Sequence, residues 1–172
     1  MIEKSTKGRV LEFFFRNPSK ETHLRELSRL LKLSMPTIIS VTDDLAKENL
    51  IVKVKSSFIT KVHANRENTR FIGKKRIYNL AAVFESGIVE HLVKIYNHPK
   101  MIILFGSFSR GDDIEKSDVD IAVVTKKKVI FDATQHEKFL GRGISIHEVD
   151  LSEVSEEFKL NLANGIILEG SW

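Results

Sequence analysis

The sequence predicts an α+β protein with two domains, and three observations support this prediction. In residues 1–80, apolar positions at helical spacing come first and are followed by segments that alternate apolar and basic residues. In the second half, two short runs, Met101–Phe105 and Val119–Val124, are apolar throughout, as buried strands are. Charge divides the chain in the same way: residues 1–80 contain 17 Lys and Arg against 8 Asp and Glu, whereas residues 81–172 contain 10 against 15. We therefore expect the basic half to bind a polyanion such as DNA and the acidic half to bind a cation.

Composition narrows the class of protein further. The chain has 172 residues, of which 42% are hydrophobic and 29% charged, as is ordinary for a globular protein. No run approaches the roughly 18 apolar residues that cross a membrane, and the first residues lack the apolar segment of a secretory signal. The absence of cysteine excludes disulfides and thiolate-bound zinc. We therefore expect a cytoplasmic protein with no membrane partner.

Three helices are expected in the first 50 residues. Proline disfavours the helical conformation in the residue before it, so Pro18 ends the first helix. Thr22 can cap the second helix. Ser34 is a good N-cap for the third, and Pro36 is tolerated in its first turn. The expected helices are Lys7–Arg16, His23–Leu31 and Met35 to about Glu48.

Two antiparallel strands are expected next, because Leu50–Lys55 and Lys74–Leu80 both alternate apolar with basic or polar residues. Residues 56–73 between them are polar, basic and too many for a simple hairpin. Three short helices followed by two strands resemble the winged helix-turn-helix of transcription regulators, here covering residues 6–80. This resemblance implies that helix 34–48 enters the DNA major groove and that the basic connection forms the wing. The DNA contacts that it implies are Thr37, Ser40, Lys53, Lys55, Lys61, Arg66, Arg70, Lys74, Lys75 and Arg76.

The expected recognition helix has few side chains that read bases. Its exposed first turns offer Thr37, Ile39 and Ser40. None of these is Arg, Lys, Asn or Gln, the side chains that read base edges bidentately. We therefore expect weak sequence-specific readout, with affinity from phosphate contacts by residues such as Arg25 and Arg29. The alternative is that this domain docks a protein partner and that its basic residues form a solvated face.

A helix is expected to link the two domains. Ala81–Tyr96 places apolar residues on one helical face, and Asn97-His98-Pro99 ends the helix. Helices that follow a wing can pack against a second copy, so we expect a homodimer that presents two basic domains to DNA. The expected domains are 1–80, the winged helix-turn-helix; 81–98, the linker or dimerisation helix; and 99–172, a domain that contains the apolar strands.

The segment between the two apolar strands carries a candidate site. Gly106 lets the backbone turn without a Cβ penalty, so the amides after it can point at an anion such as phosphate. Asp118 and Asp120 are separated by one residue at the start of the second strand, and strand alternation puts both carboxylates on the same side. Paired carboxylates are hard oxygen ligands that suit magnesium bound to the phosphates of a nucleotide.

These residues, together with Ser107 and Arg110-Gly111, resemble the GS, RG and DxD signature of the DNA polymerase beta-like nucleotidyltransferases, especially the minimal nucleotidyltransferases. The resemblance covers residues 101 to about 170 and implies an α/β domain with a small mixed sheet. It implies that Gly106, Ser107 and Arg110 bind the triphosphate of ATP or another nucleoside triphosphate. It also implies that the two aspartates are catalytic and hold Mg²⁺. Members of this family modify small molecules, nucleic acids or proteins, and some are antitoxins that adenylylate a toxin, so a toxin-like protein is one candidate acceptor.

The third strand of this domain lacks an acid at the expected place. Active relatives usually carry a third carboxylate there, which serves as the base or as an added metal ligand. Ser145 falls at that position and is neutral. Glu148 has the opposite parity, Asp150 falls in the following loop, and His147 shares the face of Ser145 and is a candidate base. The other expected elements are Val129–Leu140, either strand or helix, the third strand Ile144–Val149, a helix Ser155–Leu162 and a strand Ile166–Leu168.

Three functions remain open at this point. The first is a nucleotidyltransferase with a DNA-binding domain, which binds Mg-nucleoside triphosphate and transfers a nucleotidyl group to a hydroxyl acceptor. The second is a non-catalytic DNA-binding regulator that uses the nucleotidyltransferase fold as a nucleotide sensor or dimerisation scaffold, and Ser145 supports it. The third is a pure protein-interaction module, and it is supported by the lack of base-reading side chains in the expected recognition helix.

Overall fold

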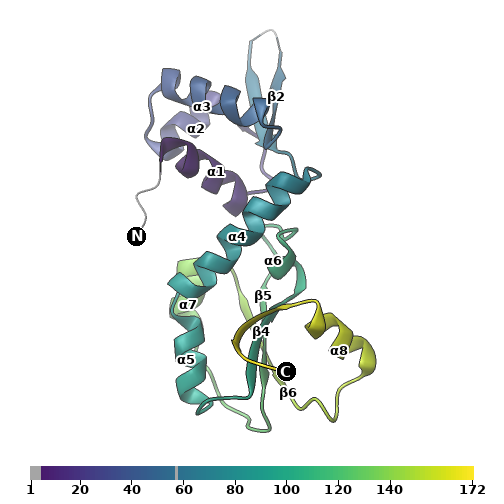
Figure 1. Ribbon diagram of the computed structural model, residues 1–172. Helices are drawn as coiled ribbons and strands as arrows, with labels where there is room; N and C mark the ends of the chain where they lie inside the picture. The colour runs from purple at the N-terminus through teal and green to yellow at the C-terminus, as the bar shows by residue number, and fades with distance from the viewer. Residues whose placement is uncertain (1–4, 57) are drawn as a thin grey trace. The chain divides into compact units, whose positions relative to one another are not determined.

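The computed structural model describes residues 5–56 and 58–172 (Figure 1). The chain forms two compact units, residues 1–75 and 76–172, with the boundary inside one helix. The functional boundaries expected from the sequence, 1–80, 81–98 and 99–172, are not tested by this division and stay predictions. Among the described residues, none of the helices combines the length and the apolar character needed to cross a membrane.

The first unit is built from three helices and a small antiparallel sheet. Its strands lie in the order β1-β3-β2. Its core is formed by side chains that are fully buried, among them Val10, Phe14, Leu27, Ile38 and Leu45. The elements are α1 (Thr6–Arg16), β1 (Thr22–His23), α2 (Leu24–Leu31), α3 (Met35–Lys47), β2 (Ile51–Lys55), β3 (Thr60–Ala64) and the start of α4 (Thr69–Glu85).

All three expected helices are present, but Thr22 does not cap the second one. Ser34 caps α3 as expected, since its hydroxyl accepts a hydrogen bond from the Thr37 amide. In contrast, His23 precedes α2 without a side-chain cap. Thr22 instead pairs with Val62 in the sheet, and its hydroxyl donates to Glu26 Oε2 over 2.8 Å. Sheet pairing therefore takes the backbone of Thr22 away from the helix start.

The second strand of the expected wing was placed wrongly. The partner of β2 is β3, which follows it after four intervening residues, and Lys74–Leu80 belongs to helix α4. Phe71, Lys75, Asn79 and Val83 are all buried and recur every four residues, as one face of a helix requires. Two of these four are polar, so the helical period did not show in the apolar residues, and the local alternation was mistaken for a strand.

The second unit is a four-stranded mixed sheet covered by helices, in the strand order β6-β5-β4-β7. Strand β5 is parallel to β6 and antiparallel to β4, which is also antiparallel to β7. The resulting α+β architecture with small sheets confirms that part of the expected fold class. The elements are α4, α5 (Ile88–Ile95), β4 (Met101–Phe105), α6 (Gly106–Arg110), β5 (Val119–Val124), α7 (Thr134–Leu140), β6 (Ile144–Val149), α8 (Glu156–Ala163) and β7 (Ile166–Gly170).

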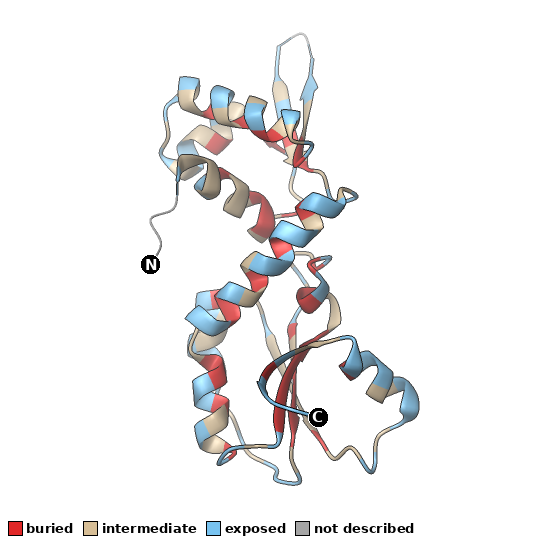
Figure 2. Cartoon of the chain, in the orientation of Figure 1, coloured by how far each residue is buried: buried red, intermediate tan, exposed pale blue. Residues whose placement is uncertain are grey.

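Strand β4 is buried along its whole length, so the side chains on both of its faces are covered (Figure 2). On one face, Ile102 and Leu104 pack with Leu92 of α5, and on the other face Ile103 and Phe105 pack in the cluster that contains Leu162 of α8. A continuous apolar run is therefore what β4 requires, because its side chains meet apolar partners on both sides.

The expected single helix over residues 81–96 is divided in two. Helix α4 ends at Glu85, and α5 begins after Gly87, whose φ of 72° lies in the left-handed region that favours glycine. Phe84, one of the apolar residues of the segment Ala81–Tyr96, is exposed, whereas Ile88 and Leu92 are fully buried. The glycine thus changes the direction of the chain and reorients the residues that follow it.

Candidate active site

Gly106 and Asp120 lie against each other at one end of the sheet. Antiparallel pairing of β4 and β5 sets Phe105 opposite Asp120, and Gly106 follows with a φ of 71°. A Cβ atom on Gly106 would lie 2.3 Å from Asp120 Oδ2, closer than any real contact. Glycine is therefore required twice at this position, once for the backbone turn and once for the approach of the carboxylate.

Asp118 lies in a similar relation to a second glycine, Gly143. A Cβ atom there would lie 2.6 Å from Asp118 Oδ1. The Val119 amide donates to the Gly143 carbonyl over 2.8 Å, which holds the backbone of β5 beside the turn before β6. The Ser145 hydroxyl donates to Asp118 Oδ2 over 3.4 Å. The two aspartates thus sit at the same end of the sheet, each against the backbone of a glycine.

The environment of Asp120 makes its ionised form less favourable than that of an exposed carboxyl while no cation is bound. Burial raises the pKa of Asp120 above its ordinary value, and nearby Asp118 raises it further. His147, whose Nε2 lies 3.7 Å from Asp120 Oδ1, and Arg110 act in the opposite direction without cancelling the effect of burial. A bound cation would relieve this penalty, because it would stabilise the ionised carboxylate.

The third strand places a serine beside the two aspartates. Parallel pairing of β5 and β6 sets Ser145 opposite Asp120. Glu148 has the other parity, as expected, and accepts hydrogen bonds from the Tyr96 hydroxyl (2.8 Å) and the Val129 amide (2.6 Å). Asp150 lies beyond the strand, where it pairs with Lys126 and bonds Ser152. Neither acid therefore joins the two aspartates.

The donor set fits a magnesium ion that is shared with a substrate. Within residues 5–56 and 58–172, no three His, Cys, Asp or Glu side chains gather closely enough to hold a metal by themselves. Magnesium, however, is commonly bound through one or two carboxylates, with phosphate oxygens and waters completing the shell. Asp118 and Asp120 provide two carboxylates, and Ser145 adds a hydroxyl oxygen next to them.

All three expected phosphate ligands, Gly106, Ser107 and Arg110, lie in the short helix α6. Ser107 is partly buried, and its carbonyl accepts the Gly111 amide over 3.0 Å, which closes the helix. Arg110 is about half exposed, and its Nε donates to Asp112 Oδ2 over 3.2 Å. The contact between Gly106 and Asp120 brings this helix next to the aspartates, but the guanidinium of Arg110 is engaged by its neighbour.

A buried polar cluster, which the sequence analysis missed, supports this helix. Asn79 of α4 donates to the Phe108 carbonyl (2.9 Å) and to Asp113 Oδ1 (2.7 Å). Arg142, next to Gly143, approaches Asp113 Oδ2 at 3.7 Å, and both side chains are buried. The cluster therefore joins α6 to the turn against which Asp118 lies. Asp113, the second residue after the RG motif, was the available signal, but its partners are distant in the sequence.

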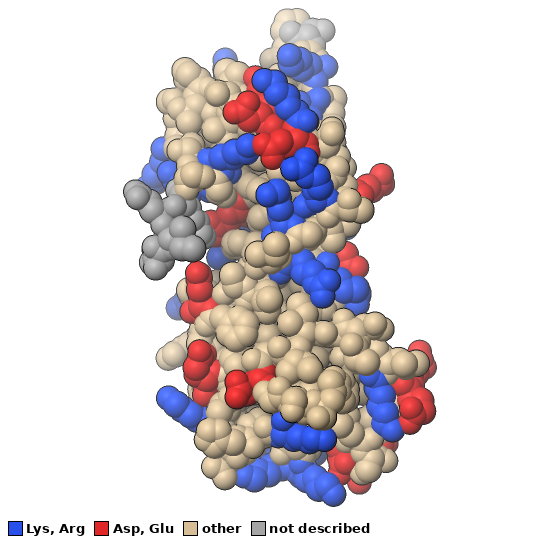
Figure 3. All heavy atoms as spheres, in the orientation of Figure 1, with Lys and Arg blue, Asp and Glu red and all other residues tan. Residues whose placement is uncertain are grey.

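The expected DNA contacts differ widely in availability. Lys53 is only 9% exposed, and its Nζ lies 2.8 Å from Asp43 Oδ1. Lys61 is also paired, with Glu21 at 2.6 Å. Lys75 is buried, at 1% exposure. On the face drawn in Figure 3, acidic and basic side chains of the first unit are interspersed. Of the remaining expected contacts, Thr37 is partly buried beside Ser34 and Arg66 lies 3.4 Å from the Ser19 hydroxyl, while Ser40, Lys55, Arg70, Lys74 and Arg76 are exposed.

Comparison with known proteins bears on the second unit. Residues 88–171 match the family model described as polymerase beta, nucleotidyltransferase. The matched range contains Gly106, Ser107, Arg110, Asp118 and Asp120, and it supports a nucleotidyltransferase domain at the level of the family. No curated protein and no solved structure gave a match.

Proposed function

We propose that the second unit binds a nucleoside triphosphate with magnesium and transfers its nucleotidyl group to a hydroxyl acceptor with release of pyrophosphate. We also propose that the first unit binds duplex DNA. The observation that carries the first part is the contact between Gly106 and Asp120. It joins the start of the phosphate-binding turn to a metal-binding carboxylate, the two features that a metal-nucleotide requires in one place.

Each residue of the site has a distinct part in this proposal. Asp118 and Asp120 hold the magnesium ion, which supplies charge neutralisation for the phosphates when it is bound. Ser107 and the amides at the start of α6 bind phosphate oxygens. Arg110 exchanges its bond to Asp112 for a phosphate, since a guanidinium binds either anion through the same N–H groups. The acceptor is a hydroxyl of a small molecule, a nucleic acid or a protein, including a toxin-like protein.

A specific observation favours a second candidate, a DNA-binding regulator that binds nucleotide without turnover. Ser145 lies opposite Asp120, where a carboxylate would complete the site. Its hydroxyl donates to Asp118, but a neutral serine is a poor acceptor for the proton of an attacking hydroxyl. Binding of a metal-nucleotide needs only the two aspartates and the phosphate ligands, so it survives the absence of a base.

The order of elements in the first unit supports the DNA-binding part of the proposal. Helix, strand, two helices and a two-stranded hairpin follow one another, with Ser34 capping the helix assigned to the major groove. Exposed Lys55, Arg70 and Lys74 are the cations best placed to meet phosphates. A homodimer would present two such surfaces to two half-sites.

The nucleotide site can be tested by calorimetric titration of the full-length protein with ATP, with and without magnesium. We expect saturable binding that depends on magnesium in the wild type. The double variant Asp118→Asn, Asp120→Asn should lose that dependence, because the ion then has no anionic anchor. Ser107→Ala and Arg110→Ala should each weaken binding.

A matched control removes two carboxylates elsewhere. Glu153 and Glu157 are exposed, and the variant Glu153→Gln, Glu157→Gln should bind Mg-ATP like the wild type. Equal magnesium dependence in the wild type and in the aspartate double variant would contradict the proposed site.

A further inference from the structure

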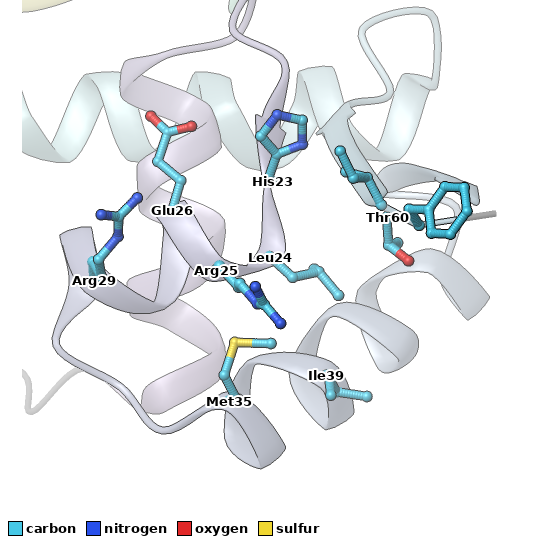
Figure 4. A pocket seen from close by; sticks show the side chains of 10 residues that line it. His23, Leu24, Arg25, Glu26, Arg29, Met35, Ile39 and Thr60 are labelled. Atoms are coloured by element: carbon cyan, nitrogen blue, oxygen red, sulfur yellow. The ribbon is translucent and has the colours of Figure 1, made fainter. Parts of the chain in front are cut away.

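A groove opens on the first unit between α2, the first turns of α3 and residues 58–60 (Figure 4). Its volume of about 530 Å³ falls within the range of small-molecule sites in proteins, roughly 300–1,000 Å³. The groove lies outside the nucleotide site and entirely within residues 1–75. It is therefore a cavity that the proposed transfer reaction does not use.

One wall of the groove is apolar and open to solvent. Leu24, Met35, Ile39, Phe58 and Ile59 line it. The exposed fraction is 96% for Phe58, 47% for Ile59 and 43% for Ile39. Large apolar side chains that gather around one concavity mark a binding site more often than scattered ones do. The flexible thioether of Met35 can also adapt to ligands of different shapes.

The same groove presents two arginines without ionic partners. Arg25 and Arg29 are exposed, lie one turn apart on α2 and both line the groove. Within the described part of the chain, neither guanidinium group makes a hydrogen bond or an ion pair. Some other cations of this unit are paired, as Lys53 is with Asp43 and Lys61 with Glu21. Two free guanidinium groups at one rim are suited to a carboxylate or a phosphate.

The carboxylate that lines the groove does not neutralise these arginines. Glu26 pairs with Lys20 Nζ at 3.0 Å and accepts a hydrogen bond from the Thr22 hydroxyl. The hydrogen bond from Lys20, supported by that from Thr22, lowers the pKa of Glu26, so the carboxyl is ionised and already bonded to these two groups. The groove thus retains an unpaired positive rim beside an apolar wall.

We propose that this groove binds an anionic amphiphile of small-molecule size. The apolar chain or ring lies against Leu24, Met35, Ile39 and Phe58, and the carboxylate or phosphate group lies between Arg25 and Arg29. A neutral apolar ligand would leave the guanidinium groups unpaired. A DNA backbone would engage the guanidinium groups and leave the apolar wall uncovered, so an amphiphile satisfies both halves of the groove.

The groove also overlaps the helix that is proposed to bind DNA, and this second step rests on the DNA-binding part of the proposed function. Met35 and Ile39 lie in the first turns of α3, the helix assigned to the major groove. A ligand that covers them would compete with duplex DNA for the same helix. The groove would then let a small anion release the protein from DNA.

The binding itself can be tested with full-length, ¹⁵N-labelled protein and three eight-carbon probes, each kept below its aggregation concentration. Octanoate and octyl phosphate carry an anionic head, and octanol carries a neutral one. We expect saturable amide shift changes around the groove, with at least one of the two anions binding tenfold or more tightly than octanol. The tighter of the two identifies the head group. Equal affinity for all three, or shift changes confined to other regions, would overturn the proposal.

Variants separate the two halves of the groove. Arg25→Gln with Arg29→Gln should weaken anion binding at least tenfold and leave octanol binding unchanged, whereas Ile39→Ser should weaken all three probes. Lys32→Gln with Lys47→Gln removes two exposed cations of the same unit that do not line the groove, and this variant should bind all three probes like the wild type. Wild-type anion affinity in the arginine variant, or an equal loss in the lysine variant, would each contradict the assignment. Circular dichroism checks that every variant is folded.

Competition with DNA is a separate measurement on the wild type. Addition of the tighter anion should raise the dissociation constant for duplex DNA, and it should have no such effect in the arginine variant. If the protein does not bind duplex at all, the DNA-binding part of the proposed function fails. The amide shift changes still decide whether the groove binds an anionic amphiphile.

Discussion

The two units use their charged residues in opposite ways. In the second unit, Asp118 and Asp120 converge at one end of a sheet, where each lies against a glycine. Burial raises the pKa of Asp120, so a bound cation would stabilise its ionised form. In the first unit, several of the cations that suggested DNA binding are engaged locally, Lys53 by Asp43 and Lys61 by Glu21.

This difference shows that a motif with defined spacing is a stronger guide to a site than net charge is. The strands of the second unit set the register of the two aspartates, so their spacing in the sequence determines their geometry. Net charge includes every cation of the first unit with equal weight. A paired or buried lysine, however, releases few counterions when DNA binds.

The largest effect is expected at Ser145. If its position lacks a base, the wild type should bind Mg-ATP and turn over slowly, and Ser145→Asp should raise transfer to a suitable acceptor by about 10²- to 10⁴-fold, the usual contribution of a positioned base. Single-turnover assays with labelled ATP would measure the rate. Ser145→Ala is the control, because it removes the hydroxyl without adding an acid. A fast wild type that loses activity in His147→Ala would place the base on His147 instead.

The contact between Gly106 and Asp120 should be nearly as sensitive. Gly106→Ala introduces a Cβ atom into the carboxylate and a side chain at positive φ, so we expect at least a tenfold loss of Mg-ATP affinity. The strained backbone should also cost roughly 1–3 kcal/mol of stability, measured by denaturant unfolding. Gly73→Ala is a suitable control because a Cβ there meets nothing within 4 Å. That change should leave nucleotide affinity intact and raise stability by about 0.5–1 kcal/mol.

A smaller effect distinguishes free from paired cations in the first unit. Duplex binding by the full-length protein should weaken steeply with salt. Arg70→Gln with Lys74→Gln should lower the slope of log K against log salt by roughly 1.8, because each phosphate contact contributes about 0.9. Lys53→Gln with Lys61→Gln should change the slope less, since both lysines are paired. Equal changes in the two double variants would show that pairing does not limit DNA contact, and a slope near zero in the wild type would favour a protein partner.

The smallest effect on the site is expected from Glu148, which faces away from it. Burial opposes ionisation of Glu148, but the bonds from Val129 and Tyr96 and the nearby Lys128 outweigh it and hold the pKa of Glu148 below its ordinary value. A lowered folded-state pKa stabilises the protein above the unfolded value of about 4.3, and this stability is lost as pH falls through the folded value.

Glu148→Gln should therefore flatten the decline of unfolding free energy below about pH 5, where an ordinary carboxyl begins to take up its proton. Loss of a hydrogen bond to a charged acceptor should lower stability at neutral pH by about 1.5–3 kcal/mol. Mg-ATP affinity should not change. Glu153→Gln provides the exposed control, and an identical pH profile for wild type and Glu148→Gln would contradict the assigned role.

Local patterns in the sequence were sufficient for β4, β5, β6 and the three helices of the first unit. Each of these has a periodicity or a cap that depends on residues near it in the chain, such as the Ser34 cap or the apolar run Met101–Phe105. The parity of β6 was also predictable, and the opposite directions of Ser145 and Glu148 follow from it. The sheet that joins these strands then brings the motif residues together.

Contacts between residues distant in the chain could not be read in this way. The buried face of helix α4 includes two polar residues, Lys75 and Asn79, so its apolar residues alone do not show a helical period. Segment 74–80 was therefore taken for a strand. The partners of Lys53 and of Asn79 lie on other elements, so their engagement depends on how the helices and strands pack. Spacing along the chain thus established which residues share a strand face, whereas packing in three dimensions established which charges are free, because pairing and burial depend on distances that sequence order does not specify.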